Sequence, residues 1–346
     1  MKNSQGKITI KQLAEHAGVS ISTASRVINN KEYVSAETRK RVEEAIAVLN
    51  FMPDHYARGM RGVKSNVIAL VIPDILNVYY TNLAREIEKD LRKNGFTMLL
   101  GITNDSTDLL QDYLEKFSKV CIDGIIYTPP PDKESSPYIR SLGQSGMPIV
   151  ELNRRSEKDL FDGVEADNFG AVVQALEYLY SLNHRRIAFI VGSGMTTTGS
   201  QRLEGYKYFL NKNGIEYIPE LVQVGEFSRE FGEQATTEIL NVMGENKPTA
   251  IFPTSNRLLM GAMEILKQNQ IEIPEDISVV AMDDAEWLES FEPSITTVDV
   301  AIEQMSQLTV DLLISRINEE DHNENPRTYT LSTNLKIRNS CRRLAY

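Results

Sequence analysis

Side chains that could read a DNA sequence stand close together near the N-terminus. Ile21, Ser22 and Arg26 recur at a spacing that brings residues to one side of a helix. An arginine can bond guanine through two hydrogen bonds, a serine hydroxyl can bond a base or a phosphate, and an isoleucine can pack on a thymine methyl group. Because any solvated helix can carry serine and arginine, this pattern favours DNA binding only together with the features below.

A second group of side chains suits a small polar ligand. Arginine, aspartate and asparagine that converge on one crevice can bind neighbouring hydroxyl groups with charge-assisted hydrogen bonds. Flat aromatic rings can cover an apolar face of the same ligand. The predicted members are Tyr79, Tyr80, Asn153, Arg202, Phe227, Ser255, Asn256 and Asp283, and Arg154 follows Asn153 at the same predicted strand end. For any single member a structural role is the alternative.

Three short helices are predicted to position the first group. Thr9 and Ser20 can cap two helices, and Gly18 lies in the turn between them, where a positive φ brings no Cβ clash. Ser35 can cap a third helix. The residues predicted to be buried are Ile10, Leu13, Ala14, Ala17, Ala24, Val27, Ile28, Val42, Ala45, Ile46 and Leu49. Two helices joined by a tight glycine-containing turn form a helix-turn-helix.

Short apolar runs alternate with amphipathic stretches from Asn66 onward, which predicts parallel sheets covered by helices. Strands are predicted at 67–72, 97–102, 122–127, 149–152, 187–191, 221–224, 249–252 and 278–282, and helices at 82–94, 169–182, 201–213 and 256–269. The pattern runs twice, so we expect two doubly wound lobes. Such lobes place a ligand in the crevice at the carboxyl ends of their strands, where the second group is expected.

Charge is divided unequally along the chain. Residues 1–64 contain 11 Lys and Arg against 6 Asp and Glu, which gives a net charge of +5. Because the net charge of the whole chain is −11, the remaining residues have a net charge of −16. A basic N-terminal segment joined to an acidic remainder indicates that the N-terminal segment binds a polyanion. The sequence has no apolar run of the roughly 18 residues needed to cross a membrane, and we identify no signal peptide in it. It has only two cysteines, which fits a reducing compartment. We therefore expect a cytoplasmic protein without a membrane partner.

Motifs of common enzyme and metal sites are missing. The sequence has no G-x-x-x-x-G-K-[ST] loop, no H-E-x-x-H pair and no G-x-S-x-G turn. Its four histidines are scattered, and its two cysteines do not have the spacing of metal ligands. We therefore expect no catalytic residue, metal or cofactor. An enzyme acting on a small sugar or nucleoside, or a solute-binding protein, is the alternative use of the same crevice.

The N-terminal part resembles the DNA-binding headpiece of the LacI (lactose repressor) family. The resemblance is carried by residues 8–30, 34–39, 49–54 and 57–58. It implies a transcription regulator that binds as a homodimer to a pseudo-palindromic, double-stranded operator. The family's base-reading positions correspond to Ile21, Ser22 and Arg26, and its contacts with phosphates or neighbouring bases correspond to Thr9, Ser20, Ser25 and Asn29.

Residues 53–64 are the predicted hinge between the headpiece, 1–52, and the body, 65–346. Six or seven helical residues are too few to be stable alone in water, and Gly59 weakens the helix further. The resemblance implies a helix that forms only on the operator, with DNA contacts at Tyr56, Ala57 and Met60. Met60 stands where the family wedges a leucine into the minor groove, and methionine can also act as a wedge. A plain linker is the alternative.

The body resembles a periplasmic-binding-protein-type effector domain, in which the chain passes between the lobes three times. Lobe 1 is predicted at about 65–163 and 292–325, and lobe 2 at about 164–291 and 326–346. The family's principal effector contacts correspond to Arg202 and Asp283, and its stacking aromatic corresponds to Phe227. Asn153 stands where many members have aspartate, and Ser255-Asn256 replaces the usual Asn-Asp or Asp-Asp pair, which leaves the ligand's identity open.

These observations together predict a homodimeric, ligand-responsive repressor whose effector is a sugar or a sugar derivative. Induction is expected, and corepression is the alternative. Some members of the family respond through a phosphocarrier protein, which stays open as a further partner.

Overall fold

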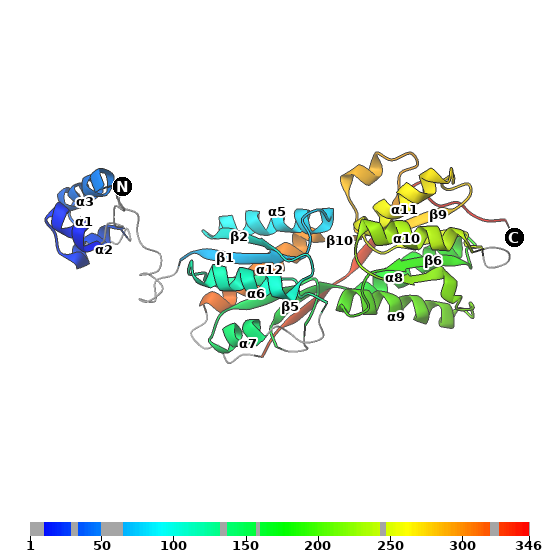
Figure 1. Ribbon diagram of the computed structural model, residues 1–346, viewed down its shortest axis with the longest axis horizontal. Coiled ribbons are helices and arrows are strands. Elements are labelled where there is room, and N and C mark those ends of the chain that lie inside the picture. Colours follow the sequence, from blue (N-terminus) through cyan, green and yellow to red (C-terminus); the bar gives the residue numbers. More distant parts are fainter. Residues whose placement is uncertain are drawn as a thin grey trace, which may run out of the picture. The chain divides into compact units, whose positions relative to one another are not determined.

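The computed structural model describes residues 10–28, 34–49, 65–131, 137–156, 160–242, 247–318 and 325–345. They form two bodies, of which the small one contains α1 to α3 and the large one all other helices and strands (Figure 1). The predicted hinge, 53–64, and the predicted DNA contacts at Thr9, Asn29, Tyr56, Ala57 and Met60 lie outside the described residues. In the described part of the chain, no helix is both long enough and apolar enough to span a bilayer.

The small body consists of three helices, α1 (Ile10–Ala17), α2 (Ile21–Ile28) and α3 (Ala36–Leu49). Their shared core contains Leu13, Ala17, Val27, Val42 and Ala45, all of which are buried. Two predicted caps are confirmed, since the side-chain oxygens of Ser20 and Ser35 accept hydrogen bonds from the backbone N–H three residues later, at 3.1 and 3.2 Å. The first turns of α2 and α3 are therefore fixed locally.

The turn between α1 and α2 depends on glycine and on an arginine from α3. Gly18 has φ +62°, which L-residues with a side chain rarely adopt. Arg41 donates hydrogen bonds from Nη2 to the carbonyl oxygens of Ala17 and Gly18, at 2.6 and 2.8 Å. Because the last carbonyls of a helix lack partners within it, Arg41 both caps α1 and joins the turn to α3.

The first lobe of the large body is a six-stranded, fully parallel sheet in the order β11-β5-β4-β3-β1-β2. Its strands are β1 (Val67–Ile72), β2 (Thr97–Ile102), β3 (Gly124–Tyr127), β4 (Ile149–Leu152), β5 (Asp162–Ala166) and β11 (Thr328–Leu331). Helices α5 (Val78–Lys93) and α12 (Ile302–Asn318) cover one face. Helices α6 (Thr107–Ser118) and α7 (Pro137–Gln144) cover the other.

The second lobe repeats this plan with the order β12-β10-β9-β8-β6-β7, in which only the edge strand β12 is antiparallel. Its strands are β6 (Ile187–Val191), β7 (Val222–Val224), β8 (Ala250–Pro253), β9 (Ser278–Met282), β10 (Thr296–Val300) and β12 (Thr333–Lys336). Helices α8 (Asn168–Ser181) and α9 (Thr197–Lys212) pack on one face. Helices α10 (Arg229–Leu240) and α11 (Asn256–Gln268) pack on the other, and short 3₁₀ turns lie at η1 (Pro219–Leu221) and η3 (Glu286–Glu289).

The chain passes between the two sheets three times, but the predicted positions of these crossings were wrong by several residues. The crossings follow β5, β10 and β11, and thus lie near residues 167, 301 and 332 rather than after 163, 291 and 325. The error has a physical cause, because these strands carry polar residues and do not form the continuous apolar runs of the central strands. Strand β10, for example, reads TTVDV.

Candidate functional site

The outward face of α2 carries the side chains that were predicted to read DNA. Ile21 is 44% exposed although it is apolar, and Ser22 and Arg26 are also exposed. Ser25 is half-buried. The hydroxyl oxygens of Ser20 and Ser22 lie 2.8 Å apart at the start of the helix. The helix thus presents an apolar contact, hydroxyl groups and a guanidinium on one surface, a combination that can contact base edges and phosphates.

A cavity between the two lobes brings together seven of the eight predicted ligand contacts. Tyr79, Tyr80, Asn153, Arg202, Phe227, Ser255 and Asp283 all line it. Asn256 does not line this cavity; its side chain is buried, and neither amide atom has a hydrogen-bond partner among the described residues. The lining residues follow the carboxyl ends of strands in both sheets, which is the usual position of ligands in doubly wound folds.

Several further cavity residues were not among the predicted contacts. The lining also includes Pro73, Asp74, Asn77, Asp105, Arg154 and Thr198. Asp105 follows β2 and Thr198 follows β6, so the strand-end rule that selected the others could have found both. Arg154 follows Asn153 directly after β4, at the same strand end.

The two lobes carry the same unusual backbone at corresponding positions. Asn153, directly after β4, has φ +65°, and Asp283, directly after β9, has φ +67°. The N–H of each donates to the neighbouring strand, from Asn153 to Val164 at 2.8 Å and from Asp283 to Val298 at 3.0 Å. Residues held in the left-handed region cost energy and cluster at functional sites. The same backbone conformation therefore places Asn153 of the first lobe and Asp283 of the second in the cavity lining.

Two buried charged groups, the Arg202 guanidinium and the Asp283 carboxyl, lie in the cavity wall. Arg202 donates from Nε to Asn168 Oδ1 at 2.9 Å and from Nη1 to the carbonyl of Thr254. Burial lowers the pKa of the Arg202 guanidinium, and the nearby Asp283 opposes this effect. Burial raises the pKa of the Asp283 carboxyl, while Arg202 acts against the rise. A ligand hydroxyl that bonded both groups would replace the solvation they have lost.

Aromatic rings form the rest of the cavity wall. Tyr79 Oη donates to Asn153 Oδ1 at 3.0 Å, and Asn153 Nδ2 donates to Tyr80 Oη at 2.9 Å, so one amide orients two rings. The Phe227 ring lies under two guanidinium groups, 5.4 Å from that of Arg154 and 5.9 Å from that of Arg202. This wall can pack on a flat ligand, and the charged groups can bind its edge.

Comparison with known proteins assigns the chain to a family. Residues 9–54 match the family model of bacterial regulatory proteins of the lacI family, and residues 176–341 match a periplasmic binding protein-like domain. The transcriptional regulator DegA of Bacillus subtilis is 32% identical over 300 residues, which cover 86% of this chain and 88% of DegA. The protein belongs to the LacI family. The repressor CytR of Escherichia coli is 27% identical over 99% of both chains.

Solved structures agree with this assignment of a LacI-family, DNA-binding transcriptional regulator. A complex of the transcriptional regulator CelR with cellobiose is 29% identical, covers 96% of this chain and all of the other, and has a TM-score of 0.70. The lac repressor dimer bound to operator and the anti-inducer ONPF is 24% identical, covers 97% and 99% of the two chains and has a TM-score of 0.79. The predicted fold, a helix-turn-helix headpiece with a two-lobed body, is confirmed.

Proposed function

We propose that this LacI-family protein is a homodimeric repressor that reads its operator with α2 and responds to a sugar or sugar derivative between its lobes. The proposal of DNA binding rests on the exposed surface of α2, where Ile21, serine hydroxyl groups and Arg26 lie together. Ser20, Ile21, Ser22, Ser25 and Arg26 are the proposed contacts on this helix. Thr9, Asn29 and the hinge residues Tyr56, Ala57 and Met60 complete the proposed set.

Operator selection from a random duplex pool tests the DNA-binding proposal. The selected duplex should lose affinity steeply with added salt, because bound lysine and arginine release phosphate counterions. Arg26→Ala should relax discrimination at one base pair per half-site by about 1–3 kcal/mol. Lys40→Ala, which removes an exposed cation from α3, is the matched control and should leave discrimination unchanged. Unchanged discrimination in Arg26→Ala would refute the role of this residue.

The proposed effector site uses Arg202 and Asp283 to bind neighbouring hydroxyls and Phe227 to pack on the ring. A sugar offers both kinds of surface, and the similar CelR binds cellobiose. Melting temperatures of the full chain, measured with a panel of sugars and sugar phosphates, should rise for the ligand that binds the folded state. Asp283→Asn should abolish this rise and the ligand's effect on operator affinity, while operator binding itself persists. Induction is proposed, and a ligand that tightens operator binding would instead establish corepression.

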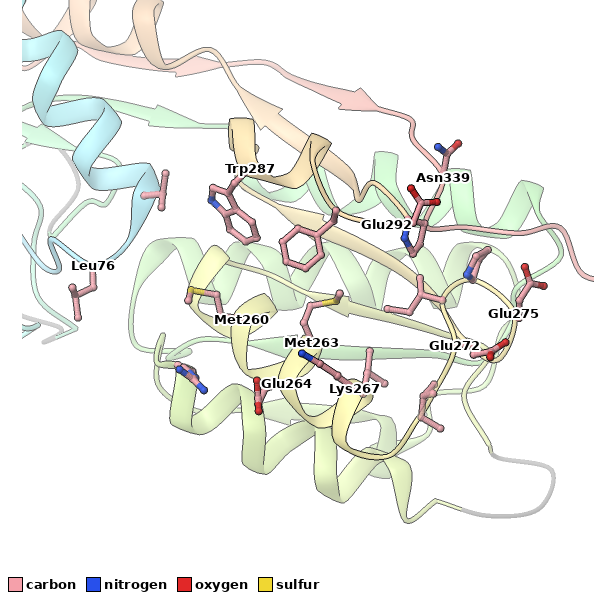
Figure 2. Close-up of a pocket in the computed structure, with 18 residues that line it drawn as sticks. Leu76, Met260, Met263, Glu264, Lys267, Glu272, Glu275, Trp287, Glu292 and Asn339 are labelled. Carbon is pink, nitrogen blue, oxygen red and sulfur yellow. The ribbon is translucent and has the colours of Figure 1, made fainter.

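Dimerisation is proposed through an apolar hollow on the second lobe. The hollow, of about 1160 Å³, lies between α11 and the segment around η3, and Figure 2 shows Met260, Met263 and Trp287 around it, with Leu76 from the first lobe nearby. Met260 is 37% and Phe291 39% exposed, and clusters of this kind mark interaction surfaces. Sedimentation should show a dimer for the native chain and a monomer for Met260→Glu. A dimer in that variant would place the interface elsewhere.

A further inference from the structure

Three side chains of the first lobe form one hydrogen-bonded unit in the wall of the cavity. Asn153 directly follows β4, and Tyr79 and Tyr80 stand in the first turn of α5. All three are buried, and all three line the cavity. The two rings meet edge to face, with their centroids 5.2 Å apart and an angle of 78° between their planes. Because every member belongs to one lobe, the geometry of the unit does not depend on the angle between the lobes.

The Asn153 amide gives the two tyrosine hydroxyls opposite roles. Tyr79 donates its proton to Asn153 Oδ1 at 3.0 Å, and Met305 Sδ lies 3.2 Å from the same hydroxyl oxygen. Tyr80 instead accepts a hydrogen bond from Asn153 Nδ2 at 2.9 Å. An amide can do this because its oxygen only accepts and its nitrogen only donates. Burial raises the pKa of both tyrosines, so each hydroxyl keeps its proton at neutral pH.

This arrangement leaves the Tyr80 proton without an acceptor. The Tyr80 oxygen accepts from Asn153, and among the described residues no atom accepts a hydrogen bond from this hydroxyl. A buried donor without a partner is unfavourable. Since Tyr80 lines the cavity, a bound ligand can supply the missing acceptor. Tyr79 has already given its proton to Asn153, so toward the same ligand it can only accept.

We propose that Asn153 is a positioning residue that sets effector specificity by making the Tyr80 hydroxyl a donor, and the Tyr79 hydroxyl an acceptor, toward the effector. The inference rests on the proposed effector site and deepens it. The matching ligand presents an accepting oxygen to Tyr80 and a donating hydroxyl to Tyr79. A sugar has both, because its ring and glycosidic oxygens carry no proton and its hydroxyls do. In Asn153→Asp the carboxylate would accept from both tyrosines, and neither hydroxyl could then donate to a ligand.

Raman spectra of the full-length chain test the two hydroxyl roles without ligand or DNA. The intensity ratio of the tyrosine Fermi doublet is higher for a phenol that accepts a hydrogen bond than for one that only donates. The native spectrum minus that of Tyr80→Phe should therefore show a higher ratio than the native spectrum minus that of Tyr79→Phe. A reversed order would overturn the proposal, and this comparison does not require any variant of Asn153 to fold.

The same measurement in the Asn153→Asp background tests the role of the amide. There the Tyr80 ratio, obtained by subtracting the spectrum of the double variant with Tyr80→Phe, should fall to the level of a donor. The exposed Tyr208 of α9, measured in the same way with Tyr208→Phe, is the control and should keep its native ratio. An unchanged Tyr80 ratio would show that Asn153 does not set this hydroxyl's role.

Ligand binding by the same variants tests the effect on specificity. Any sugar of the melting panel, with cellobiose included, that stabilises the native chain should bind Asn153→Asp about 10- to 100-fold more weakly, because its accepting oxygen meets no donor. Tyr80→Phe should weaken binding in the native chain but add little in Asn153→Asp. Equal affinity of the native and Asn153→Asp chains would refute the role in specificity. If no sugar stabilises the native chain, the proposed effector class fails, and the Raman ratios still decide the hydroxyl roles.

Discussion

Replacing Asp284 with asparagine should cost the second lobe about 2 kcal/mol at neutral pH. The Asp284 carboxylate is 9% exposed and accepts hydrogen bonds from Arg338 at 2.8 and 3.1 Å, from Lys336 at 2.8 Å and from Thr297 at 2.7 Å. Burial by itself would raise the pKa of this carboxyl, but the three donors outweigh it and lower the pKa from 3.8 to about 2. Since each pKa unit is worth about 1.4 kcal/mol, the charged form stabilises the fold by about 2 kcal/mol.

The same linkage fixes the direction of the pH dependence. A carboxyl whose pKa is lower in the folded state stabilises the protein above the unfolded pKa and loses this contribution as the pH falls toward the folded pKa. The free-energy difference between native and Asp284→Asn should therefore be complete at pH 7 and shrink between about pH 4.5 and pH 2, with about half of it gone near pH 3.

Urea unfolding followed by tryptophan fluorescence is a suitable assay. The chain has one tryptophan, Trp287, which lies in η3, three residues after Asp284, and so reports on the second lobe. Asp299→Asn is the matched control, because Asp299 pairs with Lys336 at 2.8 Å in a more exposed position, and such a pair is worth at most about 1 kcal/mol. The reasoning is refuted if the two variants are equally stable at pH 7, or if the effect of Asp284→Asn does not diminish in acid.

Three further substitutions test packing in other parts of the chain. Gly18→Ala should destabilise the headpiece by about 1–2 kcal/mol, because φ is +62° and the new Cβ would lie 2.9 Å from Arg41 Nη2. Faster amide hydrogen exchange over residues 10–49 would show this loss of stability, and Gly18→Asn should destabilise the headpiece less. Asp162→Ala should cost about 3–5 kcal/mol in urea unfolding, because Arg316, bonded to Asp162 twice at 2.9 Å, would lose its buried carboxylate; a loss below 1 kcal/mol would contradict this. Ser340→Ala should cost about 1–3 kcal/mol in the tryptophan assay, because its buried hydroxyl bonds one backbone N–H and one carbonyl, and a native midpoint would argue against it.

The central strands of both sheets could be predicted from the sequence because both of their faces are buried. The segments 67–72 and 278–282 read as unbroken apolar or small residues and form β1 and β9 with the predicted bounds. Strands β11 and β12 lie at sheet edges and read TYTL and TNLK, with mostly exposed side chains. Without a buried face they leave no hydrophobic pattern to find, and the crossing that follows β11 was misplaced for this reason.

The candidate site was predictable to the extent that it follows from topology. Strand ends meet at one edge of a parallel sheet, so the residues after β1 and β4 had to converge in the first sheet and those after β8 and β9 in the second. Sequence could not show that Asn256 does not line the cavity, because a residue at a helix start can aim its side chain in several directions. Nor could it show that Arg154 reaches across to Phe227, since that contact depends on how far the two lobes are closed.

The three passages between the sheets also affect the order in which parts of the chain can fold during synthesis. Each lobe takes its last strand from the end of the chain, β11 at 328–331 for one and β12 at 333–336 for the other, and the first lobe also waits for α12. Domains emerge from the ribosome N-terminal end first, so a nascent chain displays its three-helix headpiece long before either lobe is whole. A chain that lacked the residues from 328 onward would keep its headpiece, but both of its lobes would lack an edge strand.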